Sequence, residues 1–255
     1  TLIEVIQIRY GSKVFKLILF LSIFYMSIFL IAEVTAVSIL LEYISGTSLW
    51  ITALIIISSS LIYTLYGGLR ASIFTDNIQF IILILFLLIC FSFIISTNLS
   101  NFNFNFISSN KPNLVSFSNL SNYTAGITFF IAVAATNLFH QGNWQRIYAA
   151  KNNTVLKKSL IISFLTIIPI VFLMGFFGLI AVSENSNIIS DLAFFSLLLK
   201  EKSQLIALLL IILAISLTVS SIDTILNAIA SLIIVDANKV IKYKGNYLQI
   251  SKIIV

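Results

Sequence analysis

The chain has 255 residues, of which 59% are hydrophobic and only 9% are charged. Because a soluble domain carries about 25% charged residues, this composition excludes a soluble protein and indicates membrane-spanning helices. The formal net charge of +6 is therefore interpreted as a signal of membrane topology, and we expect no nucleic-acid partner. With Cys90 as its one cysteine, the chain has neither an intrachain disulfide nor a cysteine metal cluster.

Six apolar segments are long enough to cross a lipid bilayer, which takes about 20 residues each. They are expected at about 17–45, 49–67, 73–97, 123–142, 158–183 and 204–235. The first and last are longer than a bilayer needs, so we expect them to tilt or to extend into water. The predicted fold is an all-α polytopic membrane helix bundle, forming a single transmembrane domain over residues 1–255.

Both ends of the sequence indicate an internal fragment of a larger membrane protein. The chain starts at Thr1, and its opening "TLIEVIQIRYGSK" is polar enough to be a loop. A new apolar run begins at the other end, in "LQISKIIV". We therefore expect the transmembrane domain to be incomplete at both ends.

Lysine and arginine are distributed unequally between the two sides that these spans define. One side carries twelve of them, and the other carries only Lys111, Lys200 and Lys202. Since cytoplasmic loops carry the excess of positive charge, both ends of the chain are predicted to be cytoplasmic at the plasma membrane. The loops at 98–122 and 184–203 are then extracellular.

Three acidic residues fall inside predicted spans, where charge is costly and usually functional. Asp76 lies near the start of its span, where a carboxylate at a helix N-terminus is an equally good interpretation. Glu33 lies well away from both ends of its span, and a structural hydrogen-bond role is the favoured interpretation. Asp223 lies in "LTVSSIDTILNAIAS", among several hydroxyl-bearing residues.

The hydroxyl-rich stretch around Asp223 has a helical pattern. Positions 217, 220, 221 and 224 share one face of a helix. Hydroxyls and freed carbonyls can bind a hard cation such as Na⁺ without burying much net charge. Close packing of helices through small residues explains the same pattern, and from the residues alone that alternative is favoured.

"NLFHQGNWQR", residues 137–146, places many hydrogen-bonding groups at the end of an apolar segment. An interfacial helix end explains Trp144 and Arg146 as anchors at headgroup level. It explains Asn137 and Gln141 less well, since they lie further in. The other interpretation is a discontinuous helix whose exposed backbone faces a water-filled cavity, the kind of break at which transporters bind substrate and ions.

Four motifs, in order along nearly the whole chain, resemble the sodium/solute symporter family. They are "TLIEVIQIRYGS" (1–12), "GGLRASIFTDNIQ" (67–79), "NLFHQGNWQRIYAAK" (137–151) and "SSIDTILNAIASLIIVD" (220–236). The resemblance implies a leucine-transporter-like fold with two inverted five-helix repeats, in which helices one and six are broken. By position the six spans resemble core helices three to eight, so this chain alone is not expected to transport.

The resemblance also implies roles for single residues. Ser220, Ser221 and the carbonyl of Leu217 match the family's sodium site. Asn137 matches a substrate-contacting asparagine, and His140 stands at the position of an aromatic gate residue. With Gln141, these two are the expected lining of the solute path.

Asp76 matches an acidic position linked with ion exit. Asp223 is a further candidate as an accessory ion residue. No role carries over for Glu33.

The favoured function is therefore a sodium-coupled symporter that imports a small polar organic solute through the lipid bilayer, with sodium as the co-transported ion. A sensory input module of the same fold, attached to a signalling protein, is the alternative. An enzyme is not expected, because the chain has one histidine, one cysteine and no metal-ligand spacing. Amino acids, quaternary amines, urea and organic acids all remain open as solutes.

Overall fold

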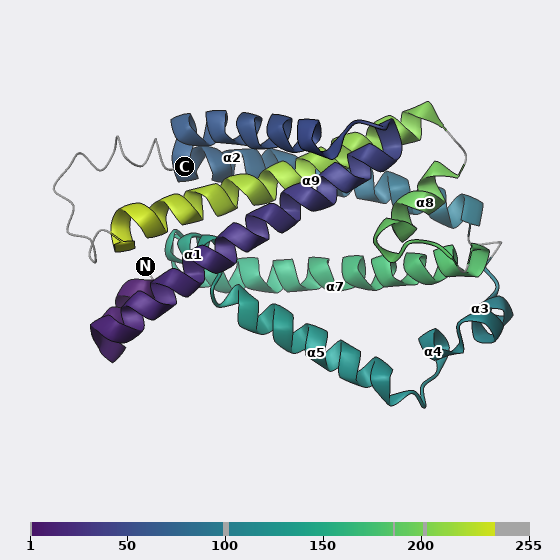
Figure 1. Cartoon of the computed structure of the whole chain (residues 1–255), viewed down its shortest axis with the longest axis horizontal. Coiled ribbons are helices and arrows are strands. Elements are labelled where there is room, and N and C mark those ends of the chain that lie inside the picture. The colour runs from purple at the N-terminus through teal and green to yellow at the C-terminus, as the bar shows by residue number, and fades with distance from the viewer. Residues whose placement is uncertain (1, 99–101, 186, 201–202, 238–255) are drawn as a thin grey trace. The chain divides into compact units, whose positions relative to one another are not determined.

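The computed structural model describes residues 2–98, 102–185, 187–200 and 203–237, and within these ranges the chain is helical without strands (Figure 1). This confirms the predicted all-α fold class. The long helices are α1 (Leu2–Ser45), α2 (Leu49–Asn98), α5 (Leu120–Asn137), α7 (Asn153–Glu184) and α9 (Gln204–Ser231). The short elements are α3 (Phe104–Asn110), α4 (Pro112–Val115), α6 (Gln141–Tyr148), the 3-10 turn η2 (Ser190–Leu192), α8 (Ala193–Leu199) and the π-helical turn η3 (Leu232–Ala237).

Four helical segments of the described residues are long and apolar enough to cross a membrane. They are Leu2–Ser45, Ser72–Thr97, Asn153–Glu184 and Gln204–Asp236. Helices α5 and α6 add a fifth candidate when they are counted as one broken span. The sequence predicted six, and the remaining one, 49–67, coincides with the first part of α2, of which Leu49–Ile62 is an apolar helix.

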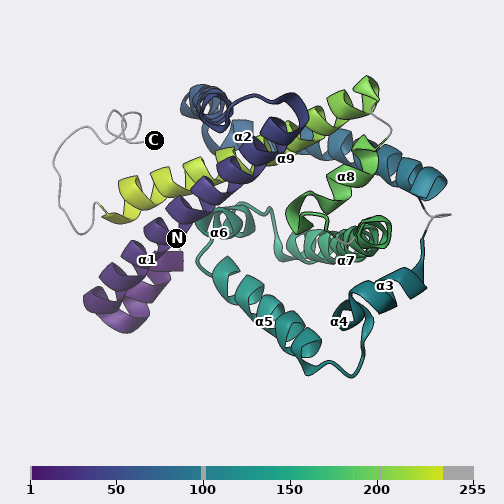
Figure 2. The same cartoon turned by 45° about the vertical axis from the view of Figure 1, so that its right-hand side comes forward.

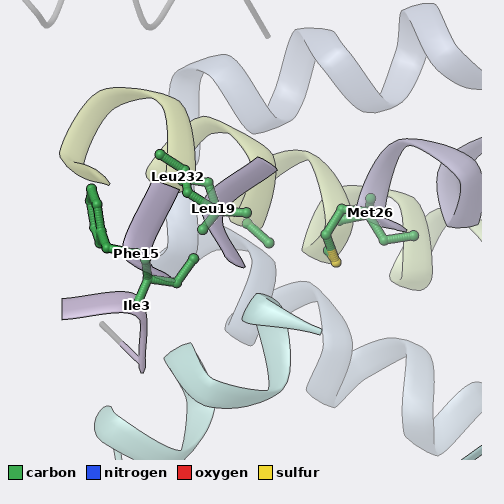
Figure 3. Packing of buried hydrophobic residues seen from close by; sticks show 7 residues of the cluster. Ile3, Phe15, Leu19, Met26 and Leu232 are labelled. Carbon is green, nitrogen blue, oxygen red and sulfur yellow. The ribbon is translucent and has the colours of Figure 1, made fainter. Parts of the chain in front are cut away.

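The first residues are helical, not a loop as the sequence analysis predicted. Helix α1 starts at Leu2 and is interrupted at Gly11, whose backbone has φ 79° and ψ 177°. Glycine adopts this positive φ without the steric penalty of a side chain. Residues on both sides of this interruption pack into one core cluster. Ile3 and Phe15 belong to it, and each is buried with 1% exposure (Figure 3).

The chain divides into two compact units. The first unit comprises Thr1–Ile82, Ala134–Ala149 and Ala214–Val255, and the second comprises Leu83–Val133 and Ala150–Leu213. In the first, Leu19 and Met26 of α1 pack with Ile225 of α9 and Leu232 of η3 (Figure 3). This apolar contact explains why α1 and the end of α9 run beside each other (Figure 1).

The second unit is built around α7. Helices α8 and α3 pack against it, and α3 also contacts α4 (Figure 2). Phe177 of α7 is fully buried, and its ring centroid lies 5.1 Å from that of Phe91 and 6.2 Å from that of Phe194. The segments 98–122 and 184–203, which the sequence predicted as loops, contain short helices among their described residues.

Candidate functional site

The segment 137–146 is an interrupted helix in the structure. Helix α5 ends at Asn137, and α6 begins at Gln141 after His140, whose φ of −79° and ψ of 91° are extended (Figure 2). The three residues between the helices turn through hydrogen bonds of the i to i−3 type, for example from the His140 amide to the Asn137 carbonyl at 3.2 Å. The chain therefore has the discontinuous helix that was one of the two interpretations of this stretch.

Side chains of α6 satisfy polar groups at the break. Asn143 Nδ2 donates to Asn137 Oδ1 at 2.9 Å, and Trp144 Nε1 donates to the carbonyl of Leu138 at 2.9 Å. Leu138 follows the last residue of α5, and the indole supplies a donor to its carbonyl. Trp144 thus stabilises the interruption, which its interpretation as a headgroup anchor did not include.

Helix α6 lies very close to α9. A Cβ atom added at Gly142 would lie 2.6 Å from Cγ2 of Thr224 and 3.0 Å from Cε1 of His140. One turn further along α6, Gln145 Nε2 donates to Ser231 Oγ at 2.7 Å. The absence of a side chain at Gly142 is therefore what allows the two helices to approach.

Asp76 lies at the centre of a polar network that joins three helices of the first unit. Its carboxylate pairs with the guanidinium of Arg146 from α6 and accepts a hydrogen bond from Ser220 Oγ of α9 at 2.6 Å. Arg146 also donates to Thr224 Oγ1 at 2.6 Å. The Asp76 side chain is only 20% exposed. The free-energy cost of removing its carboxylate from water is offset by a charged partner and by charge-assisted hydrogen bonds.

Asp223 belongs to the same part of the first unit but points elsewhere. It is fully buried, and its two carboxylate oxygens accept from Thr224 Oγ1 at 3.2 Å and from Thr75 Oγ1 at 3.5 Å. At about 100° per residue, Asp223 lies about 200° around the helix from Ser221, and it lines no part of the cavity described next.

A cavity of about 310 Å³ lies within the first unit, between α1, α6 and α9. Its lining is largely polar and comprises Phe29, Glu33, His140, Asn143, Arg146, Ser220, Ser221 and Thr224. The His140 ring meets Phe29 edge to face, with 5.5 Å between the ring centroids. His140 itself is buried, and its Nδ1 has no hydrogen-bond partner among the described residues.

The structure brings some of the predicted site residues together and leaves others apart. Ser220, Ser221 and His140 line the cavity, and Asp76 is bonded to Ser220. Asn137 and Gln141 do not line it: Asn137 is bonded to Asn143, and Gln141 is buried.

The carbonyl of Leu217 also lies outside the cavity lining. It already accepts a hydrogen bond from Ser221 Oγ at 3.4 Å. An ion could therefore use this carbonyl only if that hydrogen bond were released or if a further lone-pair direction were open.

The sequence did not single out Arg146 or Asn143 as members of the site, whereas it placed Thr224 on the hydroxyl face with Ser220 and Ser221. Arg146 was interpreted as an anchor at the membrane surface. Its position in "QGNWQRIYAA" gave no sign of a partner elsewhere in the chain. Glu33 was singled out as an acidic residue, but no sequence signal linked it to α6 or α9. These contacts join residues that are far apart in the chain, as in the 70-residue separation of Asp76 and Arg146.

A bundle of apolar helices with one helix broken beside a polar cavity is the architecture of a membrane transporter. The sequence model of the Sodium:solute symporter family matches residues 1–254, and the chain belongs to this family. It is a multi-pass membrane protein of a transporter family, as the four motifs predicted.

Two curated proteins are similar in sequence. The spermidine transporter DUR31 of Candida albicans is 28% identical over 236 residues, which are 90% of this chain and 44% of that protein. Solute carrier family 5 member 4A of Mus musculus is 31% identical over 100 residues, covering 37% of this chain and 15% of that protein. The chain thus spans less than half the length of these relatives, and no solved structure matches it significantly.

Proposed function

We propose that the protein imports a small polar organic solute across the plasma membrane, driven by the inward movement of Na⁺, with both ends of the present chain in the cytoplasm. The observation that carries this proposal is the polar cavity beside the interrupted helix, with two serine hydroxyls in its wall. Family membership supports the coupling to sodium, and both named relatives are transporters, which favours transport over a sensory role.

For the cation, we propose a site formed by Ser220, Ser221 and the carbonyl of Leu217. Ser220 donates its proton to Asp76, and Ser221 donates to the Leu217 carbonyl. A hydroxyl whose proton is engaged in this way has lone pairs left to bind a cation. Asp76 contributes negative charge next to Ser220, and we propose it as the residue on the ion exit path, with Asp223 as an accessory.

For the solute, we propose a path past Asn137, His140 and Gln141 at the break. His140 supports this part of the proposal because it lines the cavity, and Asn137 because it is bonded to the cavity residue Asn143. The Candida relative is named for spermidine, a small water-soluble polyamine, which fits a solute of small size and high polarity.

The test is solute uptake into liposomes that contain the purified whole protein. A panel of labelled amines, amino acids, urea and organic acids is offered under an inward Na⁺ gradient and, as the control, under an equal K⁺ gradient. We expect at least one solute to accumulate with Na⁺ and not with K⁺. Accumulation that is equal in the two gradients would contradict coupling to sodium, and no accumulation of any solute would contradict import.

A further inference from the structure

Glu33 is an acidic side chain without a hydrogen-bond or ion-pair partner among the residues that the structure describes. It lies well inside α1, a helix long and apolar enough to span a membrane, and it faces the cavity of the first unit. A carboxylate at membrane depth is costly unless a cation or a set of donors compensates it. The Glu33 carboxylate therefore has to be neutralised by a bound cation or by a proton.

The nearest candidate inside the protein is already engaged. Arg146 is the one basic side chain in the lining of this cavity, and its guanidinium is bound by Asp76 and Thr224. No ion pair joins Arg146 to Glu33 within the described part of the chain. Glu33 is thus an acidic group of the cavity wall without a charged partner among the described residues, next to hydroxyl, amide and imidazole groups.

We propose that Glu33 recognises the ammonium group of a cationic organic solute in this cavity. The inference rests on the proposed function, and it names the class of solute as a small primary amine or polyamine. The volume of about 310 Å³ lies at the lower end of the range of small-molecule sites, which begins near 300 Å³, and a single sodium ion does not need it.

The rest of the wall suits an organic cation. Phe29 and His140 meet edge to face beside Glu33, and an aromatic wall attracts organic cations through the negative face of its ring. Asn143 adds an oxygen acceptor for a remaining ammonium proton. A neutral or anionic solute would leave Glu33 without its counter-charge, so the cavity selects by charge.

The experiment measures equilibrium binding to the purified whole protein in saturating Na⁺. The probes are 1,4-diaminobutane and spermidine, with 1,4-butanediol as the uncharged analogue. We expect the amines to bind and the diol not to compete with them. Glu33→Gln should raise the Kd of both amines about 10- to 150-fold, the range for hydrogen bonds to charged groups, and Glu33→Asp should recover part of the loss.

Two controls keep the result interpretable. Glu42→Gln changes an exposed acidic residue on the same helix, outside the cavity, and should leave the Kd unchanged. The Na⁺ concentration for half-maximal uptake should change less than twofold in Glu33→Gln. Because the probe series on the unmodified protein tests charge selection directly, poor folding of a variant would not obscure the outcome.

Several results would overturn the inference. Equal binding of the diol and the diamine would exclude selection by charge. An unchanged amine Kd in Glu33→Gln would show that Glu33 is neutral or structural, and a large rise in the half-maximal Na⁺ concentration alone would make the cavity a sodium site. Sodium-driven uptake of neutral or anionic solutes without amines would contradict this inference but leave the proposed function standing, whereas no uptake at all would overturn both.

Discussion

Asp76 shows how a single carboxylate can connect three helices. It accepts from Ser220 of α9 and pairs with Arg146 of α6, which in turn donates to Thr224. Each partner stabilises the charged form of the carboxylate, and the carboxylate fixes the position of each partner. Any cation that binds at Ser220 therefore lies one hydrogen bond away from the Asp76–Arg146 pair, so binding and the position of α6 are physically linked.

The first prediction concerns the strength of that pair. Arg146→Gln and Asp76→Asn should each lower stability by about 1–2 kcal/mol, because hydrogen bonds to charged groups contribute about 1.5–3 kcal/mol and partial exposure reduces the value. The measurement is thermal unfolding in detergent, where each kcal/mol corresponds to about 2–4 °C. In Asp76→Asn/Arg146→Gln the two losses should not add.

The comparison is the ion pair between Lys200 and Glu184, with N and O 3.0 Å apart, in which the lysine side chain is 51% exposed and the glutamate side chain 15%. Lys200→Gln should change the midpoint less than Arg146→Gln does, because the Lys200 side chain is 51% exposed and solvent screens its attraction to the carboxylate. If the losses of stability in Asp76→Asn/Arg146→Gln are strictly additive, the interaction between the two side chains contributes nothing to stability.

The sequence predicted the residues of this region better than their partners. The motif "FTDNIQ" singled out Asp76, and the hydroxyl face singled out Ser220, because both signals are local in the sequence. Arg146 was interpreted as an anchor, since a lone arginine at the end of an apolar run usually snorkels to the membrane surface. Its real partner is 70 residues away, and a spacing of that kind has no periodic signal in a single sequence.

At the scale of elements, the break between α5 and α6 combines an extended residue, a close approach and a set of side-chain hydrogen bonds. His140 is extended, Gly142 allows α9 to come close, and Asn143 and Trp144 bond back across the break. The polar residues Asn137 and Gln141 made an interruption predictable. The role of Gly142 as a contact point was not, because only the fold shows which helix lies against it.

The second prediction tests that contact. Gly142→Ala should reduce uptake and thermal stability, because the new Cβ would lie 2.6 Å from Thr224 Cγ2, and overpacking typically costs about 1–3 kcal/mol. In Gly142→Ala/Thr224→Ser much of the loss should return, since serine keeps the hydroxyl that binds Arg146 and lacks the methyl group. Uptake assays and thermal unfolding measure both effects.

Gly126→Ala and Gly178→Ala serve as controls, because a Cβ at either position meets nothing within 4 Å. They should match the unmodified protein, or be slightly more stable because alanine is the better helix former. If Gly142→Ala behaves like these controls, α6 and α9 are not in close contact in the working protein.

For the molecule as a whole, composition and hydropathy were sufficient to predict a helical membrane protein, and the motifs were sufficient to predict its family. The number of spans was harder to predict. A hydropathy pattern counts apolar stretches, and it treats the broken pair α5–α6 in the same way as an unbroken span. The short helices α3, α4 and α8 carry no strong period and were expected only as loops.

The third prediction concerns the orientation of the chain. Ser118→Cys should react with a membrane-impermeant maleimide on intact cells and Asn153→Cys should not, both in a Cys90→Ser background. Both side chains are exposed, and Cys90 is buried, so the difference should report the side of the membrane. Labelling of Asn153→Cys together with protection of Ser118→Cys would reverse the proposed topology.

The sodium dependence of uptake shows whether α9 holds a sodium ion. In liposomes with the whole protein, Ser220→Ala and Ser221→Ala should each raise the Na⁺ concentration for half-maximal uptake about 5- to 150-fold, the equivalent of roughly 1–3 kcal/mol for a lost ligand to a cation. Ser27→Ala is the matched control, because its hydroxyl donates only to the Ile23 carbonyl of its own helix at 2.9 Å, and it should leave that concentration unchanged. Equal, small effects of all three substitutions would contradict a sodium site on α9 and leave helix packing as the role of its serines.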